Sequence, residues 1–89
     1  MKVLLFSVLR DIARVKEVND IAAENVESLL NILCERYGKK FYDWVWKDGS
    51  LSNEIIILVN GRAIEHLDSI HTKLTDKDEV AIFPKMAGG

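Results

Sequence analysis

Hydrophobic positions recur along the chain with two different periods, and these periods predict its secondary structure. Residues 2–9 form an apolar run rich in Val, Leu and Phe, which predicts a first strand. Its alternation predicts a core face and an outer face, and the outer one carries Leu4, Phe6, Val8 and Arg10. A turn over residues 11–14 and a shorter strand over residues 15–22 would complete a hairpin.

A helix is predicted over residues 26–37, where apolar residues follow helical spacing. They are Val26, Leu29, Leu30, Leu33, Cys34 and Tyr37. Asn25 is expected to cap this helix with its side-chain oxygen, and Gly38 to end it with a left-handed backbone. Residues 39–46 predict a short second helix or a turn, which ends at the loop Asp48-Gly49-Ser50.

The second half of the chain predicts further strands. The run 54–59 contains three consecutive isoleucines, and the turn signal Asn60-Gly61 and a short return strand at residues 62–64 follow it. Polar turn residues at 74–78 lead into a last strand, 79–83, which Pro84 is expected to end. Alternation turns four side chains of these strands outward: Ile56, Leu58, Ala81 and Phe83.

The order of hairpin, helix and further strands predicts an α+β fold in which one mixed sheet packs on one main helix. This is the β-grasp, or ubiquitin-like, arrangement. A single domain over residues 1–84 is expected, followed by a tail of residues 85–89. The tail lacks periodicity and ends in Gly88-Gly89, so we expect it to be mobile.

Composition narrows the class of partner. The 89 residues are 48% hydrophobic and 29% charged, which is typical of a globular domain. A net charge of −2 argues against nucleic acid as the main partner. No apolar run is long enough for a membrane helix, and the single Cys34 forms no internal disulfide, so a cytoplasmic location is expected. Cys34 lies on the apolar stripe of the predicted helix and is interpreted as a buried structural thiol.

Several segments of the sequence resemble the MoaD family, the small subunit of molybdopterin synthase, within the wider MoaD/ThiS group of ubiquitin-like sulfur carriers. The resemblance covers nearly the whole chain. It lies in residues 3–10, in Val26-Glu27-Ser28-Leu29-Leu30, in Val59-Asn60-Gly61, and above all in residues 74–84 at a fixed distance before Gly88-Gly89. Two features depart from the family pattern: Lys85 replaces a second proline, and residues 39–53, with Trp44 and Trp46, have no clear counterpart.

The resemblance implies a mechanism centred on the chain end. A separate E1-like enzyme would use ATP to adenylate the Gly89 carboxylate, and sulfur from a persulfide donor protein would displace AMP. The resulting thiocarboxylate would donate sulfur in the large subunit of molybdopterin synthase. Glycine at positions 88 and 89 suits this role because a backbone without Cβ atoms passes through a narrow channel. The chain itself would be a carrier without catalytic groups, and we expect it to bind no cofactor or metal.

Partner binding is predicted for the apolar outer face beside the tail and for the tail itself. The first set is Phe6, Ile56, Leu58, Ala81 and Phe83, with Arg10 at its edge to pair with an acidic partner residue. The second is Pro84, Lys85, Met86 and Ala87. The isolated His66 and His71 are expected on surface loops, and Trp44 and Trp46 in packing, with a contact to a partner left open.

Three alternatives stay open from the sequence. The same sulfur chemistry could serve thiamine or thiolated tRNA instead of molybdopterin. The same terminus could be joined to lysines of other proteins, as in a ubiquitin-like modifier. The domain could also be a β-grasp binding module with an inert tail.

Overall fold

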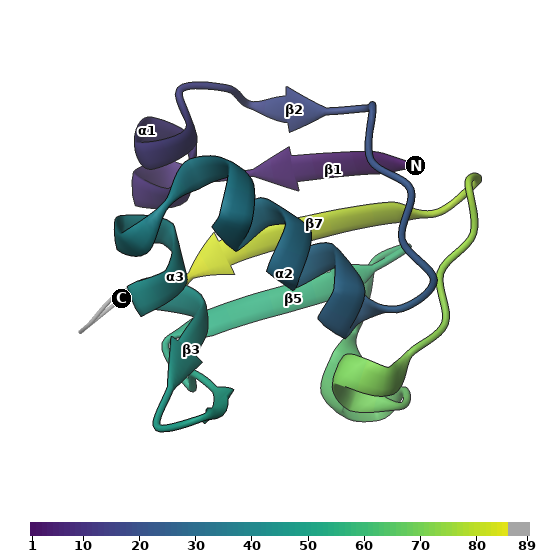
Figure 1. Cartoon of the computed structure of the whole chain (residues 1–89). Coiled ribbons are helices and arrows are strands. Elements are labelled where there is room, and N and C mark those ends of the chain that lie inside the picture. Colours follow the sequence, from purple (N-terminus) through teal and green to yellow (C-terminus); the bar gives the residue numbers. More distant parts are fainter. Residues whose placement is uncertain (86–89) are drawn as a thin grey trace.

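The computed structural model describes residues 1–85, which form a mixed sheet with a long helix across one face (Figure 1). The sheet order is β2-β1-β7-β5-β6. Its strands are β1 (Lys2–Leu5), β2 (Glu17–Val18), β5 (Ile55–Val59), β6 (Arg62–Ala63) and β7 (Glu79–Pro84). A separate hairpin comprises β3 (Trp46–Lys47) and β4 (Ser50–Leu51). The helices are α1 (Ser7–Ala13), α2 (Val26–Tyr37), α3 (Lys39–Val45) and the 3-10 helices η1 (Ile64–His66) and η2 (Ser69–His71).

The centre of the sheet is a parallel pair formed by the first and last strands. β1 runs parallel to β7, with Leu4 opposite Ala81, while β5 pairs antiparallel with the other side of β7. These two central strands come from opposite ends of the described chain, so the contact that joins them has a long sequence separation. The α+β class, the mixed sheet and the β-grasp order are therefore confirmed.

Helix α2 supplies most of the helical side of the core. The Asn25 side chain accepts a hydrogen bond of 2.8 Å from the backbone N–H of Ser28, which confirms the predicted N-cap. At the other end Gly38 has a φ of +90° and a ψ of −168°. The positive φ confirms why glycine is suited to this position, although the ψ lies outside the left-handed helical region.

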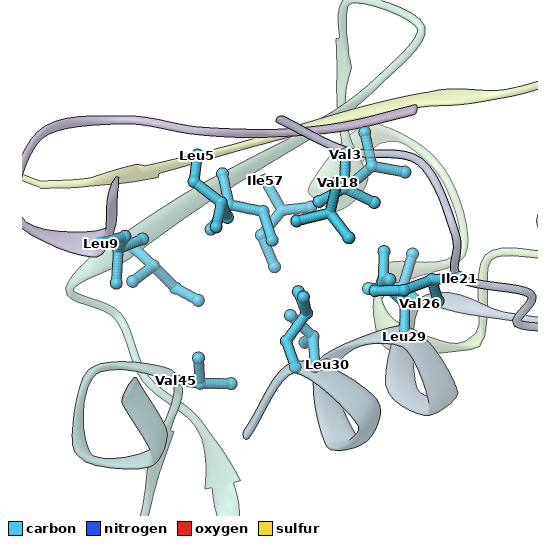
Figure 2. Close-up of a cluster of buried hydrophobic side chains, with 14 of the residues drawn as sticks. Val3, Leu5, Leu9, Val18, Ile21, Val26, Leu29, Leu30, Val45 and Ile57 are labelled. Carbon is cyan, nitrogen blue, oxygen red and sulfur yellow. The ribbon is translucent and has the colours of Figure 1, made fainter. Parts of the chain in front are cut away.

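The core lies between α2 and the inner face of the sheet. Figure 2 shows Val3, Leu5 and Ile57 of the sheet facing Leu29 and Leu30 of α2. All five are at most 2% exposed. Cys34 belongs to the same buried cluster, as predicted, and burial raises the pKa of its thiol to about 11.

The structure differs most from the prediction at residues 6–22. The first strand ends at Leu5, and residues 7–13 form α1 instead of continuing it. The apolar run is short enough to fit either period, and Leu9 and Ala13, four residues apart, are both buried as one helical face. Ser7 starts the helix with a φ of +55°, so the chain turns sharply out of the sheet. The expected strand at residues 15–22 is reduced to β2.

Smaller differences lie at the ends of other elements. Residues 39–45 are a helix, which settles the choice between helix and turn. The return strand ends at Ala63, and Ile64 begins η1. β7 includes Pro84, which is opposite Ile55 at the end of the ladder. A proline is accommodated at such a terminal strand position because its missing N–H is not needed by a central ladder bond.

Candidate docking face and tail root

The outer face of the sheet carries apolar side chains in register across three strands. Leu4 of β1, Ala81 of β7 and Leu58 of β5 form one row, since Ala81 is opposite both of the others. Ile56 is opposite Phe83 in the next row. We call this set, together with Phe6, the outer apolar patch: Leu4, Phe6, Ile56, Leu58, Ala81 and Phe83. Ile56 is 36% exposed, and the other five are half-buried.

The two phenylalanines of the patch are stacked. The rings of Phe6 and Phe83 lie nearly parallel, with 8° between their planes and 4.2 Å between their centroids. The backbone N–H of Phe6 donates a 3.2 Å hydrogen bond to the Ile82 carbonyl, which holds Phe6 beside β7 after β1 has ended. The prediction that Phe6 faces outward is confirmed by this contact, although the strand assigned to it was too long. The stack offers a rigid aromatic surface at low cost in side-chain entropy.

Arg10 lies elsewhere than the sequence analysis expected. It is on α1, not at the end of a strand, and with Arg14 and Lys16 it lines a shallow surface depression. Its guanidinium Nε lies 3.8 Å from Asp11 Oδ1, and both side chains are largely exposed. Arg10 is thus part of a basic rim formed by α1 and the segment after it, and it does not continue the row of outer strand residues.

The root of the tail is fixed to the domain. The Lys85 N–H donates a 2.6 Å hydrogen bond to the Glu54 carbonyl, just before β5. Pro84 is buried, so it anchors the strand end and does not contribute to the outer apolar patch. Glu54 also pairs with Lys47, at 3.0 Å. The predicted site residues Met86, Ala87, Gly88 and Gly89 lie outside the described residues.

A groove beside the tail root contains residues that the sequence analysis did not assign to a site. Val8 and Ile12 of α1 face Trp44 of α3 across a groove of about 500 Å³, and Glu54 lies on its rim. The sequence does contain a signal for this groove, the four-residue spacing of Val8 and Ile12. That spacing places the two side chains on one face only if residues 7–13 are read as a helix. Trp44 and Trp46 pack partly buried against the core, as expected, and Trp44 also lines this groove.

Residues 1–85 show no grouping of three or more His, Cys, Asp or Glu side chains that could hold a metal. His66 and His71 are both exposed, each at the end of a 3-10 helix. The raised pKa of Cys34 keeps its thiol neutral at physiological pH, so the thiolate needed for nucleophilic chemistry is scarce. None of the helices in this part of the chain combines the length and apolar character required to cross a bilayer.

The profile of the ThiS family matches residues 3–89, which is nearly the entire chain. The chain belongs to the ThiS family. A candidate sulfur carrier protein from Archaeoglobus fulgidus is 38% identical over 64 residues, covering 72% of this chain and 73% of the relative. The fold is therefore that of the ubiquitin-like sulfur carriers of the ThiS/MoaD group, small proteins that generally act without catalytic activity of their own.

Two solved structures similar to this ThiS-family chain belong to proteins whose names indicate different activities. Small archaeal modifier protein 1 from Methanosarcina acetivorans is 34% identical, with a TM-score of 0.88, over 99% of this chain and 94% of that one. A candidate molybdopterin converting factor subunit 1 from Pyrococcus furiosus is 31% identical, with a TM-score of 0.75, over 96% and 95% of the two chains. The family is thereby established, whereas the MoaD subgroup named by resemblance is not separated from the modifiers.

Proposed function

We propose that this protein carries sulfur as a thiocarboxylate on Gly89. The observation that carries the proposal is the family match, which extends through Gly88-Gly89 at the chain end. A carboxylate is a poor acyl donor at neutral pH, so it must first receive a better leaving group. The Gly89 carboxylate would attack the α-phosphate of ATP on an E1-like enzyme, releasing pyrophosphate and forming an acyl-adenylate.

Sulfur would then enter from a persulfide on a donor protein. The persulfide attacks the acyl carbon and AMP leaves, and a further thiol splits the remaining S–S bond to release the thiocarboxylate. The carrier would supply position rather than chemistry in these steps. Its outer apolar patch would dock on the enzyme, and the hydrogen bond from Lys85 to Glu54 would fix the point from which the tail starts.

We propose that the thiocarboxylate donates its sulfur in the active site of the large subunit of molybdopterin synthase. The support is the MoaD-like ending at residues 74–84 and the similarity to the Pyrococcus furiosus molybdopterin converting factor. The tail would thread into the active site of the large subunit while the outer apolar patch remains at its surface. A patch of apolar side chains on a small domain is typical of such protein interfaces.

A second candidate function is covalent attachment of Gly89 to lysines of other proteins. The specific observation in its favour is the similarity to the Methanosarcina acetivorans modifier, which covers 99% of this chain. Both functions begin with the same acyl-adenylate. They differ in the nucleophile that finally attacks the acyl carbon of Gly89. In sulfur carriage it is a persulfide sulfur, and the product is a thiocarboxylate. In protein modification it is a lysine amine, and the product is an isopeptide bond.

Sulfur carriage is tested by intact-mass measurement. The protein is incubated with its E1-like enzyme, ATP and a persulfide donor, and the expected product gains the mass difference between one sulfur and one oxygen. A variant lacking Gly89 is the matched control and should remain unchanged. An unmodified wild-type protein, under conditions in which the enzyme consumes ATP, would contradict the proposal.

The acceptor is tested in cells that express the tagged protein. Co-purification of a molybdopterin synthase large subunit, lost when Gly88-Gly89 is removed, would support the molybdopterin assignment. Recovery of lysine peptides bearing a Gly-Gly remnant, with no such subunit, would favour the modifier function instead. Loss of molybdenum-enzyme activity on deletion of the gene gives an independent readout.

A further inference from the structure

The outer edge of β5 is only partly covered by its neighbour. All five residues of β5 pair with β7 on one side, whereas β6 pairs only with Leu58 and Val59 on the other. β6 ends at Ala63, and the chain then turns into η1. Within residues 1–85, the first part of β5 therefore has no strand beside it on this edge.

The direction of the peptide groups along β5 follows from the turn after it. Asn60 and Gly61, with φ values of 52° and 84°, form a two-residue hairpin turn, so Val59 and Arg62 exchange backbone hydrogen bonds. Peptide groups alternate along a strand, so those of Ile57 and Ile55 also point away from β7. Two observed bonds agree with this direction: the Glu54 carbonyl and the Asn60 N–H, at even positions, both bond toward the β7 side.

A pocket of about 320 Å³ lies along this edge, where Ile55 is 7% exposed and Ile57 only 1%, so the backbone of Ile55 is the accessible part. Its apolar wall comprises Leu51, Ile55, Ile57 and Ile64. Figure 1 shows β5 running between the β3 hairpin at one end and the green turns that contain η1 and η2 at the other. Ser69, which also lines the pocket, has a φ of +50°, a conformation that is uncommon outside glycine. Three features therefore coincide at this edge: peptide groups that point away from β7, an apolar cavity, and the strained backbone of Ser69 in the cavity wall.

The rim of the pocket carries one charge of each sign. Lys85 lies near the start of β5, because Pro84 is opposite Ile55 and the Lys85 N–H bonds to Glu54. Glu65 lies toward the other end, directly after the buried Ile64. Neither side chain forms an ion pair with another residue of the described chain. Both are exposed and free to meet charges on a ligand.

We propose that this edge binds an extended peptide segment of a partner protein as an added strand. The segment runs antiparallel to β5, which is the more stable pairing, and exchanges backbone hydrogen bonds with Ile55. One apolar side chain enters the pocket. A basic residue two positions before it faces Glu65, and an acidic residue two positions after it faces Lys85, because alternate residues of a strand share a face. This site is separate from the outer apolar patch and does not depend on sulfur chemistry.

The probe is the blocked pentapeptide acetyl-Lys-Thr-Val-Thr-Asp-amide, titrated into the 15N-labelled full-length protein. Amide shifts are expected at residues 55–57 and at Glu65, whereas Leu4 and Phe6, the members of the outer apolar patch two strands away at β1, should not shift. The reversed peptide, acetyl-Asp-Thr-Val-Thr-Lys-amide, should bind roughly fivefold more weakly, since two exposed ion pairs together contribute about 1 kcal/mol. Absence of shifts at the edge, or equal binding of the two peptides, would overturn the proposal.

Charge exchange in the protein provides the decisive control. The double variant Glu65→Lys/Lys85→Glu keeps the net charge and should reverse the preference between the two peptides. The matched variant Glu24→Lys/Lys77→Glu changes exposed charges away from the pocket and should keep the wild-type preference. A dimer paired through this edge would appear as a doubled mass by light scattering and would also overturn the proposal. Sulfur transfer that succeeds without peptide binding would leave the proposed function intact and remove only this inference.

Discussion

The two faces of the same sheet use apolar residues for different purposes. On β5 the inward Ile57 is 1% exposed and lies under α2, whereas its neighbour Ile56 is 36% exposed on the opposite face. Both are isoleucines, so composition does not separate them and only the strand period does. The inner residues are accounted for by the core. The outer apolar patch is not required to fill the core, and we propose partner binding as the reason for its hydrophobic character.

The largest effect is expected on the inner face. Ile57→Ala should lower the free energy of unfolding by about 2–5 kcal/mol, because it leaves a cavity in a closely packed core. Leu58→Ala, the adjacent outer residue, should cost about 1 kcal/mol. Urea denaturation of both variants measures the contrast. Similar losses at the two positions would break the distinction between the faces.

A smaller effect is expected within the outer apolar patch, at the stacked pair of Phe6 and Phe83. Offset aromatic pairs contribute about 0.5–1.5 kcal/mol beyond their buried area. A double-mutant cycle with Phe6→Leu and Phe83→Leu should therefore give a coupling energy in this range. If the losses are additive, the two rings contact each other without stabilising each other. The stack would then not hold the outer apolar patch in a fixed arrangement.

Acid should weaken a polar cluster that belongs to neither face. The Asn60 side chain and the Thr75 N–H donate hydrogen bonds to Asp78, and they lower the pKa of its carboxyl below the ordinary value of 3.8. A carboxyl with a lowered folded-state pKa stabilises the fold above its unfolded pKa, and this stabilisation disappears as the pH falls through the folded value.

Asp78→Asn tests this pH dependence. The stability difference between wild type and the variant should shrink as the pH falls from about 6 to about 3. Thermal unfolding across that interval measures it. A difference that is constant with pH would show that the Asp78 charge does not contribute, and the exposed position of this cluster keeps the expected effect small.

The smallest effect on stability is expected at the most exposed patch residue. Ile56→Lys should change the free energy of unfolding by about 0.5 kcal/mol or less, as is usual for surface positions. Circular dichroism during thermal unfolding provides the measurement. A large destabilisation would mean that the outer apolar patch supports the fold itself, and the contrast between the two faces would lose its basis.

The sequence was sufficient where one period extends over many residues. Helix α2, its Asn25 cap and the alternation of β5 and β7 were all predicted, because spacing and burial agree at each position. It was insufficient at residues 6–13, where the apolar run fits both periods and the sharp turn at Ser7 occurs without glycine. Two features near the candidate site were also not predicted, each for its own reason. Val8 and Ile12 join Trp44 only after α1 is formed, and the pocket beside β5 depends on tertiary contacts of η1.

The most direct test of the account compares sulfur loading of Ile56→Lys with that of Asn31→Lys, an exposed substitution on α2. Both proteins should be equally folded, and the rate of thiocarboxylate formation is measured against carrier concentration with the E1-like enzyme. We expect kcat/KM to fall roughly tenfold or more for Ile56→Lys, equivalent to about 1.4 kcal/mol, and to stay unchanged for Asn31→Lys. Equal kcat/KM values for the two variants would contradict the claim that the outer apolar patch is the docking face.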